Sequence, residues 1–437
     1  MKLIRTTGPN ARAATSKLAA LERRGGAALD AVLPAVTRIV ADVRKHGDRA
    51  LLVYAAKFDS LAGPRSLRVT QKEMAEAWKV LDPALRDALA TAARQIRDFA
   101  VRQMPKPWKA STVEGLMTGQ LVRPISSVGC YVPSGRHPLP STLLMTAIPA
   151  QVAGVKRIVV VSPRPAPETL AAAHLLGITE FYRLGGAHAV AALAYGTSNV
   201  PRVDKIVGPG NLYVTGAKRL VAFDCAIDML AGPTEIVVTS ERGNAADIAS
   251  DLVAQAEHDP EALAIFVTTN EKLAGTVISE AKSRSRENPI AHQALQDNGV
   301  VIIARSADEA HEITNRIAPE HLTVDSASDL KWVQNAGSVF IGRWSAQPMG
   351  DYISGPNHTL PTGGMARVRG GLSVNDFVKL ITVQQYTAQA LNTLGPKAAL
   401  LAEAEGLHGH AEAIRTRLSA DAQRPVRVKR KSRRARG

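Results

Sequence analysis

The sequence from residue 128 to residue 342 alternates short apolar runs, turns and helical stretches, and this alternation constrains the fold more than any other feature. The apolar runs lie at 128–132, 156–161, 181–184, 204–207, 235–239, 263–267, 300–303 and 339–342. Strands that alternate with helices in this way are typical of parallel sheets covered by helices. We therefore predict an α/β protein with two sheet domains.

Helical patterns flank this alternating region. Residues 27–58 carry apolar side chains at three- to four-residue spacing, and so do residues 71–101, where Pro83 predicts a break. The region after about residue 377 also has a helical pattern. Residues 1–24 are predicted to be an N-terminal extension.

Composition limits the function classes. The chain has 437 residues, too many for one small core, and no apolar run near the roughly 20 residues that span a bilayer. The N-terminus lacks the apolar core of a signal peptide, and Cys130 and Cys225 are the only cysteines. We therefore expect a cytoplasmic protein without a disulfide framework or a membrane partner.

The net charge of +15 is concentrated at the C-terminus. Residues 424–437 contain eight Lys and Arg and no acidic residue, which leaves +7 for the rest of the chain. Such blocks are usually disordered and solvated, with weak affinity for polyanions. No aromatic residue lies among these charges, so a stacking platform for nucleic acid is not expected.

The segment 315–322 places a carboxylate next to an imidazole, directly after a proline. Pro319 disfavours continuation of the preceding helix, so Glu320 and His321 are expected at a junction between a helix and a loop. Two adjacent titratable groups can carry separate proton transfers if their surroundings separate their pKa values. The alternative, which the dipeptide alone favours, is a solvated pair at a helix end.

Other candidates are dispersed along the chain. Gln255 and His258 are three residues apart and share one helix face, so an amide oxygen and an imidazole can meet at one point. The alternative for His258 is a histidine that interacts with the last carbonyls of its helix. Asp351 and His358 lie in a segment whose composition is also that of a surface turn.

A Gly-x-Gly-x-x-Gly motif is absent from the strand-to-helix turns. The nearest substitute is the segment 208–211, Gly-Pro-Gly-Asn, which lies between a predicted strand and a predicted helix. The N-terminus of that helix can receive a diphosphate, although most turns of this composition serve only to reverse the chain.

Four stretches together resemble the histidinol dehydrogenase family, namely 206–211 (IVGPGN), 255–260 (QAEHDP), 317–322 (IAPEHL) and 355–358 (GPNH). They follow the family's order and spacing, and the resemblance extends from about residue 25 to about residue 417. It implies two incomplete Rossmann-like, aldehyde-dehydrogenase-like domains. It also implies a homodimer with one zinc ion per subunit that oxidises L-histidinol through L-histidinal to L-histidine with NAD, the last steps of histidine biosynthesis.

The resemblance also implies roles for individual residues. Glu320 and His321 correspond to the acid/base pair: neutral His321 would accept the hydroxyl proton, and Glu320 would activate a water. The implied zinc ligands are Gln255, His258, Asp351 and His410. The implied substrate contacts are Thr234, Gln255, His258, His321, Asp351, His358, Glu405 and His410. The implied NAD contacts are Tyr131, His188 and Asn211. Glu405 and His410 are expected to act in the other subunit's site, because the family's C-terminal segment reaches into it.

With this resemblance, the predicted domains become more specific. They are an N-terminal extension at 1–24, a main catalytic α/β domain at 25–127 and 231–377, an NAD-binding α/β domain at 128–230, and a C-terminal dimerisation tail at 378–437. This tail is expected to be helical and to end in a disordered basic segment at about 424–437.

The chain departs from the family at three positions. The family usually has glutamine at His188, serine at Thr234 and glycine at Ser134. These departures leave open a related zinc enzyme that oxidises another small amino alcohol or diol. A third hypothesis is a polyanion-binding protein that uses the basic tail.

Overall fold

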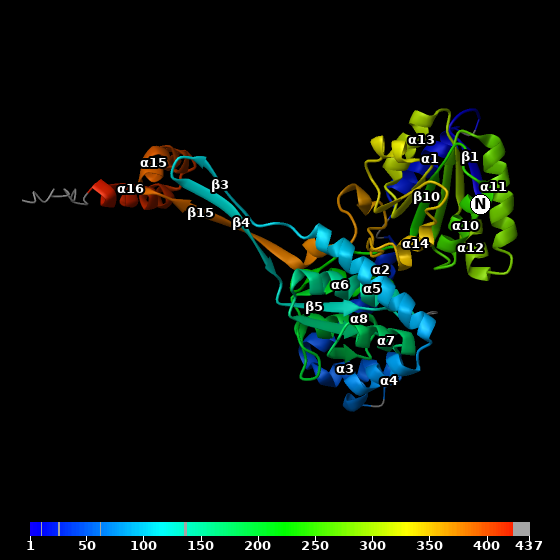
Figure 1. The fold of residues 1–437 in the computed structure, drawn as a ribbon, viewed down its shortest axis with the longest axis horizontal. Helices are drawn as coiled ribbons and strands as arrows, with labels where there is room; N and C mark the ends of the chain where they lie inside the picture. Colours follow the sequence, from blue (N-terminus) through cyan, green and yellow to red (C-terminus); the bar gives the residue numbers. More distant parts are fainter. Residues whose placement is uncertain (10, 25–26, 62, 135–137, 423–437) are drawn as a thin grey trace, which may run out of the picture. The chain divides into compact units, whose positions relative to one another are not determined.

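The computed structural model describes residues 1–9, 11–24, 27–61, 63–134 and 138–422. The chain divides into two compact units: unit 1 comprises 1–104 and 124–377, and unit 2 comprises 105–123 and 378–437. Within the described residues, unit 1 contains two six-stranded sheets (Figure 1). The basic segment 424–437 lies outside the described residues.

The first sheet has the strand order β1-β12-β11-β10-β13-β14 and is parallel throughout. Its strands are β1 (Lys2–Arg5), β10 (Glu235–Thr239), β11 (Leu263–Thr268), β12 (Val300–Ile303), β13 (His321–Val324) and β14 (Ser338–Ile341). One face is covered by α10 (Ala245–Ala256), α11 (Glu271–Arg284) and α12 (Pro289–Asp297), and the other by α1 (Ala11–Glu22) and α13 (Ala307–Ile317) (Figure 1). Cover on both faces explains why the central strands are apolar at nearly every position.

The second sheet has the order β2-β7-β6-β5-β8-β9, and only the pair of β2 with β7 is antiparallel. Its strands are β2 (Arg68–Val69), β5 (Ser127–Tyr131), β6 (Arg157–Val161), β7 (Glu180–Tyr182), β8 (Lys205–Val207) and β9 (Ala226–Ile227). Its helices are α2 (Ala27–His46), α3 (Asp48–Asp59), α4 (Gln71–Val80), α5 (Pro83–Gln103), α6 (Pro140–Ala153), α7 (Pro167–Leu175), α8 (Gly186–Tyr195) and α9 (Leu212–Val221). The predicted α/β class with two parallel sheets is confirmed.

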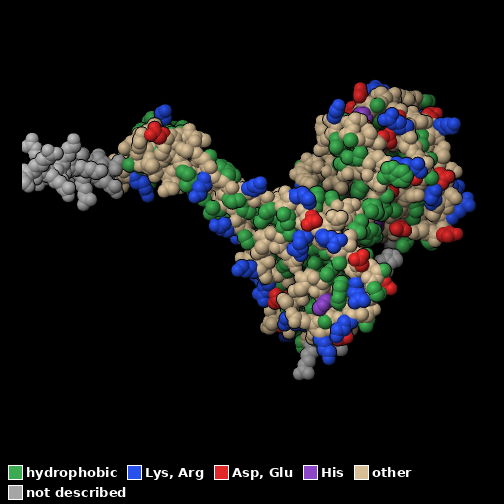
Figure 2. Space-filling model, in the orientation of Figure 1, with side chains coloured by type: hydrophobic (Ala, Val, Ile, Leu, Met, Phe, Trp, Pro, Cys, Tyr) green, Lys and Arg blue, Asp and Glu red, His purple; other side chains and the backbone are tan. Residues whose placement is uncertain are grey.

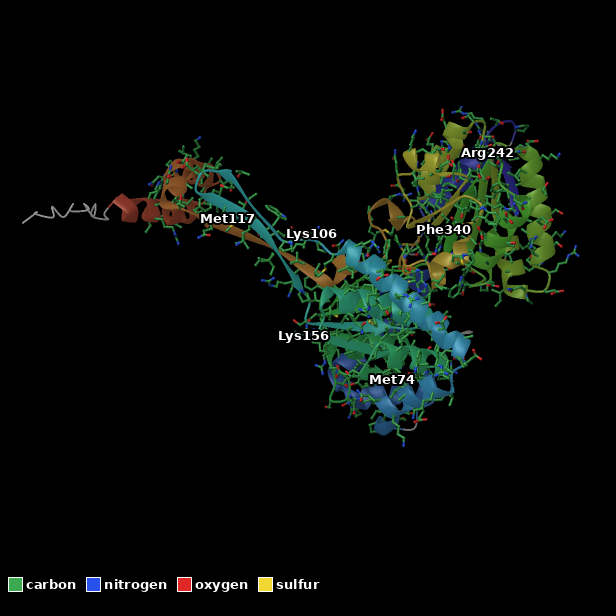
Figure 3. All side chains as sticks on the ribbon, viewed as in Figure 1. Met74, Lys106, Met117, Lys156, Arg242 and Phe340 are labelled. Carbon is green, nitrogen blue, oxygen red and sulfur yellow. The ribbon has the colours of Figure 1, made fainter. Side chains whose placement is uncertain are left out.

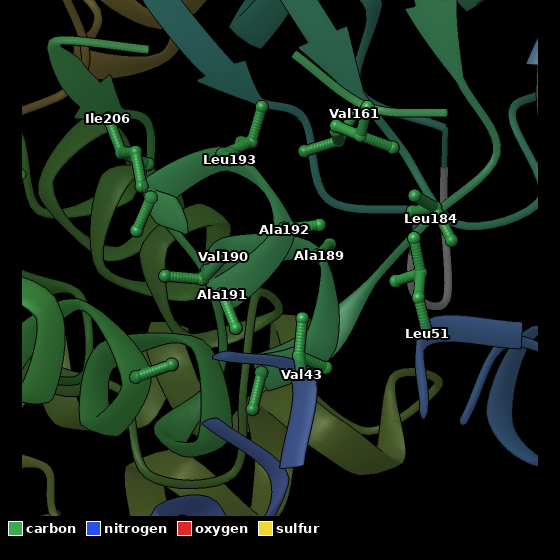
Figure 4. Close-up of a cluster of buried hydrophobic side chains, with 14 of the residues drawn as sticks. Val43, Leu51, Val161, Leu184, Ala189, Val190, Ala191, Ala192, Leu193 and Ile206 are labelled. Atoms are coloured by element: carbon green, nitrogen blue, oxygen red, sulfur yellow. The ribbon is translucent and has the colours of Figure 1, made fainter. Parts of the chain in front are cut away.

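Helix α8 lies at the centre of the core beside the second sheet. Its segment 187–194 is entirely buried and consists mainly of alanine and valine. Small side chains allow it to approach Val43 and Leu51 on one side and Val161 and Ile206 on the other (Figure 4). This close packing fixes the turn between β7 and α8, which faces the carboxyl ends of the strands.

Unit 2 contains a three-stranded sheet and two helices within the described residues. The strand order is β15-β4-β3, and the elements are β3 (Trp108–Val113), β4 (Leu116–Pro124), β15 (Val378–Tyr386), α15 (Ala388–Ala404) and α16 (His408–Ala422). The predicted helical tail is confirmed from Ala388 to Ala422. The nine residues before Thr387 form β15, a strand that the helical pattern did not predict.

Residues 1–24 and helices α2 and α3 bear on the predicted domain boundaries. Residues 1–24, expected as an extension, form edge strand β1 and helix α1 of the first sheet. Helices α2 and α3, placed with the main catalytic domain, pack against α8 beside the second sheet. The functional division into catalytic, NAD-binding and dimerisation parts stays a prediction. No helix among the described residues is both long and apolar enough to cross a membrane.

Candidate active site

The predicted acid/base pair lies where the chain enters β13, beside the amino end of the neighbouring strand β10. Helix α13 ends at Ile317, and Ala318 adopts a left-handed conformation with φ 50°. His321 then begins β13 and pairs with Ile236 of β10. The expected helix-to-loop junction holds for Glu320, which lies in the short connection 318–320, but it is wrong for His321, which already belongs to central strand β13. The solvated-pair alternative is also wrong, since Glu320 and His321 are only 6% and 3% exposed.

Glu320 is held by two donors from the start of β10. Its Oε2 accepts hydrogen bonds from the hydroxyl of Thr234 at 2.6 Å and from the backbone N–H of Glu235 at 2.8 Å. Burial raises the pKa of Glu320 to about 7, although these donors and His321 act in the opposite direction. A carboxyl with this pKa can both release and accept a proton near neutral pH.

His321 has a defined tautomer when it is neutral. Its Nδ1 lies 3.1 Å from the backbone carbonyl of Glu235, and a carbonyl only accepts, so Nδ1 carries the hydrogen. Nε2 is then left for chemistry, 3.6 Å from Oδ1 of Asp351. Burial lowers the pKa of His321, but Glu320 and Asp351 outweigh it and raise the pKa to about 9. The two carboxylates thus favour the imidazolium, whereas a divalent cation on Asp351 would favour the neutral base expected from the sequence.

Asp351 lies in the short helix α14 (Gln347–Tyr352), within a shell of polar contacts. Its Oδ2 accepts a hydrogen bond from Nε2 of Gln347 at 2.9 Å, and its backbone carbonyl accepts one from Nδ1 of His358 at 2.8 Å. His358 also lies 3.3 Å, through Nε2, from the hydroxyl of Thr142. Burial would raise the pKa of Asp351, but His321 outweighs it and lowers the pKa. The surface-turn alternative is therefore wrong for Asp351 and His358, although Met349 and Tyr352 of the same segment are exposed.

Gln255 offers an oxygen that the protein leaves without a partner. The side chain is 1% exposed and its amide nitrogen donates to the hydroxyl of Thr234. The amide oxygen is buried and has no hydrogen-bond partner. A buried acceptor in this condition is costly unless a ligand or ion satisfies it. Gln255 is thus joined through Thr234 to Glu320, and through His321 to Asp351.

His258 follows the end of α10 and is exposed. Burial is the main cause that lowers the pKa of His358, and the charge of nearby His258 adds to it. Among the residues that the structure describes, no three His, Cys, Asp or Glu side chains are close enough to hold a metal ion. The predicted ligands in unit 1 are Gln255, His258 and Asp351. They offer an amide oxygen, an imidazole nitrogen and a carboxylate oxygen.

If zinc binds as the resemblance implies, replacement of Gln255 by leucine is expected to lower the affinity for zinc by about 10- to 100-fold, because leucine has a similar volume and lacks the unpartnered oxygen. Metal analysis after equilibrium dialysis against graded zinc concentrations measures this effect. The matched control is Gln293→Leu on the exposed face of α12. Unchanged zinc affinity in Gln255→Leu would remove Gln255 from the ligand set.

A small cavity lies beside His321, Asp351 and His358. It has a volume of about 10 Å³, room for roughly one water molecule. It is lined by His321, Ser338, Phe340, Gly350, Asp351, Pro356, Asn357, His358 and Leu360. Phe340 of β14, labelled in Figure 3, has its ring centre 6.0 Å from that of His321. Binding of a substrate would therefore require the lining groups to move apart.

A larger cleft of about 770 Å³ lies over α1 and α13 and contains none of the predicted site residues. Its polar side chains are largely paired with one another. Arg316 bonds Glu22, and Asn315 bonds the backbone of residues 332–335. Of these two cavities, only the small one is lined by predicted site residues.

The remaining predicted substrate contacts belong to unit 2. Glu405 caps the C-terminus of α15, and His410 lies in the first turn of α16. Both side chains are exposed. This exposure leaves them accessible to a second molecule.

The predicted NAD contacts lie at the carboxyl ends of the second sheet. After β5 the chain proceeds to β6 and β7 on one side and then to β8 and β9 on the other, so the strand order reverses between β5 and β8. Ligands of open α/β sheets bind outside the strands at such a point. Tyr131 ends β5, and the turn 208–211 follows β8.

Each of the three predicted NAD contacts also has a partner within the protein. The hydroxyl of Tyr131 accepts a hydrogen bond from the backbone N–H of Gly186 at 3.0 Å. The ring of His188 is 1% exposed and lies 2.7 Å, through Nε2, from Oδ2 of Asp59. Asn211 caps α9 by accepting from two backbone N–H groups. The roles of these residues toward NAD stay predictions.

The sequence analysis missed groups that hold the site in place. Glu235 provides both backbone contacts to the acid/base pair, and Gln347 holds Asp351. A charged residue at the head of an apolar strand, as in EIVVT, was a usable signal for Glu235, because buried charges need partners. Gln347 carries no such signal.

The fold and the site define an α/β enzyme with a buried carboxyl–imidazole pair suited to proton transfer. A model of the histidinol dehydrogenase family matches residues 22–418. The histidinol dehydrogenase of Geobacillus kaustophilus is 47% identical over 396 residues, covering 88% of this chain and 93% of that protein. That of Methanothermobacter thermautotrophicus is 44% identical over 416 residues, covering 92% and 97%. The crystal structure of histidinol dehydrogenase from Elizabethkingia anophelis has a TM-score of 0.90 at 34% identity, covering 97% of this chain and 99% of that one. The chain belongs to the histidinol dehydrogenase family.

Proposed function

We propose that this protein oxidises L-histidinol to L-histidine through L-histidinal, with NAD as the oxidant and one zinc ion per subunit. The observation that carries the proposal is the run of buried contacts from the unpartnered oxygen of Gln255, through Thr234 and Glu320, to His321 and Asp351. Family membership over most of the chain supports the same activity.

The residues in unit 1 fit a zinc ion. Gln255 supplies a buried oxygen without a partner, Asp351 an anionic oxygen and His258 an exposed imidazole. We assign His410 of a second subunit as the fourth ligand. When bound, zinc supplies a positive centre that fixes the substrate's imidazole and amine beside the acid/base pair.

Proton transfer is assigned to His321 and Glu320. Nε2 of His321 accepts the proton of the substrate hydroxyl, because Nδ1 is engaged by the carbonyl of Glu235. Glu320 removes a proton from the water that adds to the aldehyde before the second oxidation, and its pKa of about 7 suits that role. Thr234 orients Glu320, and its hydroxyl suffices where the family usually has serine.

NAD is assigned to the carboxyl ends of the second sheet, where it supplies a hydride acceptor. Gly208 has φ +112°, and a side chain there would overlap the backbone carbonyl of Tyr131, so the turn after β8 requires glycine. The corresponding edge of the first sheet is less suitable for phosphates. It is occupied by Asp325 and Glu241, whose carboxylates accept hydrogen bonds from neighbouring groups.

A homodimer is part of this proposal. Unit 2 exposes many large apolar side chains, and Figure 2 shows hydrophobic side chains on its visible face among Lys and Arg. They are Trp108, Leu380, Ile381, Tyr386, Leu400, Leu401 and Leu407. Exposed apolar residues in such number mark an interface. A second copy of the chain would cover them and receive Glu405 and His410 in its site.

The test is turnover of L-histidinol with NAD and zinc, followed by the absorbance of NADH. Two NADH per histidinol and L-histidine as the product are expected. Mixtures of His410→Ala and His321→Ala subunits should regain activity if the sites are shared between subunits. Absence of turnover in zinc-loaded dimer would refute the proposal.

The second candidate is a related enzyme that oxidises another amino alcohol or diol. The observation that favours it is His188, which stands where glutamine is usual and whose ring is paired with Asp59. A comparison of kcat/KM for histidinol with that for simple amino alcohols separates the two candidates.

Truncation after Ala422 is expected to leave histidinol turnover within about twofold of the full chain, because the removed segment contains none of the predicted site residues. Comparison of kcat/KM for both forms measures this. Loss of all activity on truncation would contradict the interpretation of the tail as an appendage. We also propose a cytoplasmic location, consistent with two buried free cysteines among the described residues.

A further inference from the structure

We propose that Arg24 and Glu235 form a positioning pair that holds Glu320 and His321 in their working geometry. The inference rests on the proposed function, since it concerns the residues that carry out proton transfer. It gives the N-terminal segment a role in the site, although that segment was expected to be only an extension.

Glu235 contacts the acid/base pair through its backbone alone. Its N–H donates to Oε2 of Glu320 at 2.8 Å, and its carbonyl accepts from Nδ1 of His321 at 3.1 Å. The ladder with β13 starts one residue later, where Ile236 pairs with His321. The backbone N–H and carbonyl of Glu235 therefore bond the side chains of Glu320 and His321 instead of continuing the ladder. The direction in which these two backbone groups point depends on how Glu235 is held.

The side chain of Glu235 is anchored on the other side of the strand end. Its Oε1 accepts from Nε of Arg24 and from the backbone N–H of Gly363, each at 2.7 Å, and its Oε2 accepts from Nη2 of Arg24 at 2.5 Å. The two side chains are 15% and 4% exposed. A bidentate pair with this burial defines both distance and orientation, which a single contact does not.

Arg24 is in turn tied to helix α1. Its Nη1 donates a hydrogen bond to the backbone carbonyl of Leu21. The side chain of Leu21 is buried in the core beside the first sheet. A rigid path therefore runs from α1 through Arg24 to the backbone of Glu235, and from there to both members of the acid/base pair. Partners of this kind, one contact removed from the reacting groups, typically change activity by about 10- to 100-fold when they are replaced.

The experiment compares Arg24→Gln, Arg24→Lys, Glu235→Gln and the double variant Arg24→Gln/Glu235→Gln. The matched control is Arg5→Gln, which removes an exposed ion pair with Glu271 from the same N-terminal segment. Because Arg24→Gln leaves a buried carboxylate unpaired and can impair folding, the double variant, which removes both charges, provides a folded comparison.

If Arg24 and Glu235 act as a positioning pair, kcat should fall by about 10- to 100-fold in Arg24→Gln. KM for histidinol and the zinc content should stay within about twofold of wild type. The double variant should lose no more than the worse single variant, because the two residues act as a unit. Arg24→Lys should regain part of the loss, and Arg5→Gln should match wild type. Wild-type kcat in folded Arg24→Gln would overturn the inference.

A second readout does not depend on turnover. The Nδ1–H of His321, identified by its absence in His321→Ala, should give a low-field imidazole proton resonance in ¹⁵N-histidine-labelled protein. This resonance should shift or broaden in Arg24→Gln and the double variant but not in Arg5→Gln. If wild-type protein fails to oxidise histidinol, the proposed function is refuted. The resonance alone then tests whether Arg24 and Glu235 position His321. An unchanged resonance in both variants would refute the positioning role.

Discussion

Replacement of His321 by alanine is expected to lower histidinol turnover by about 10²- to 10⁴-fold, while bound zinc stays near the wild-type level. The ring is buried and directs Nε2 toward the small cavity, because Nδ1 donates to the carbonyl of Glu235. Its loss removes the base without removing any of the proposed metal ligands. Steady-state kinetics and metal analysis on the same sample measure both effects.

Two further variants separate chemistry from folding. His321→Asn retains a donor for the carbonyl of Glu235, so it should fold well and remain as inactive as His321→Ala. His46→Ala, at the exposed end of α2, should behave as wild type. Loss of zinc from folded His321→Ala would instead make His321 a ligand and would reverse the assigned roles.

Replacement of Glu320 by glutamine is expected to separate the two oxidations. The amide oxygen can still accept from Thr234 and from the backbone of Glu235, so the local structure is retained. The amide cannot remove a proton from water, and the second step should slow by about 10²- to 10⁴-fold. The yield should fall from two NADH per histidinol toward one, with histidinal as the product.

An aldehyde-trapping reagent added to the Glu320→Gln reaction should capture histidinal in an amount equal to the NADH formed. Glu287→Gln, an exposed substitution, is the control and should give two NADH. Full conversion to histidine at the wild-type rate in Glu320→Gln would assign activation of the water to another group.

Local patterns were sufficient for most of unit 1. The apolar runs of β5, β6, β10, β11 and β12 are short and bounded by turns, so their strand character is visible within a few residues. Strands β3 and β15 were missed because nearly all of their residues are exposed, which leaves no contrast between apolar and polar positions. Strand β13 was missed because it begins two residues after Pro319 and its sequence, HLTV, alternates polar and apolar residues instead of forming an apolar run.

The types of the site residues could be read from the motifs, and the resemblance to the histidinol dehydrogenase family supplied their proposed roles. The sequence determined that a carboxylate precedes an imidazole after Pro319, and that a glutamine and a histidine share a helix face. It could not indicate that the amide oxygen of Gln255 would be left without a partner, since that depends on Thr234 taking the amide nitrogen. The dipeptide alone even favoured a solvated pair.

Only the tertiary structure decided how Glu320 and His321 behave. Burial raises the pKa of Glu320, and the tautomer of His321 is set by the backbone carbonyl of Glu235 in β10, which lies 85 positions before Glu320 in the chain. Contacts over such separations leave no periodic trace in the sequence, because each is set by how two strands align in the sheet. The sequence thus determined which groups are available, and the packing of the sheet decided which protons they can move.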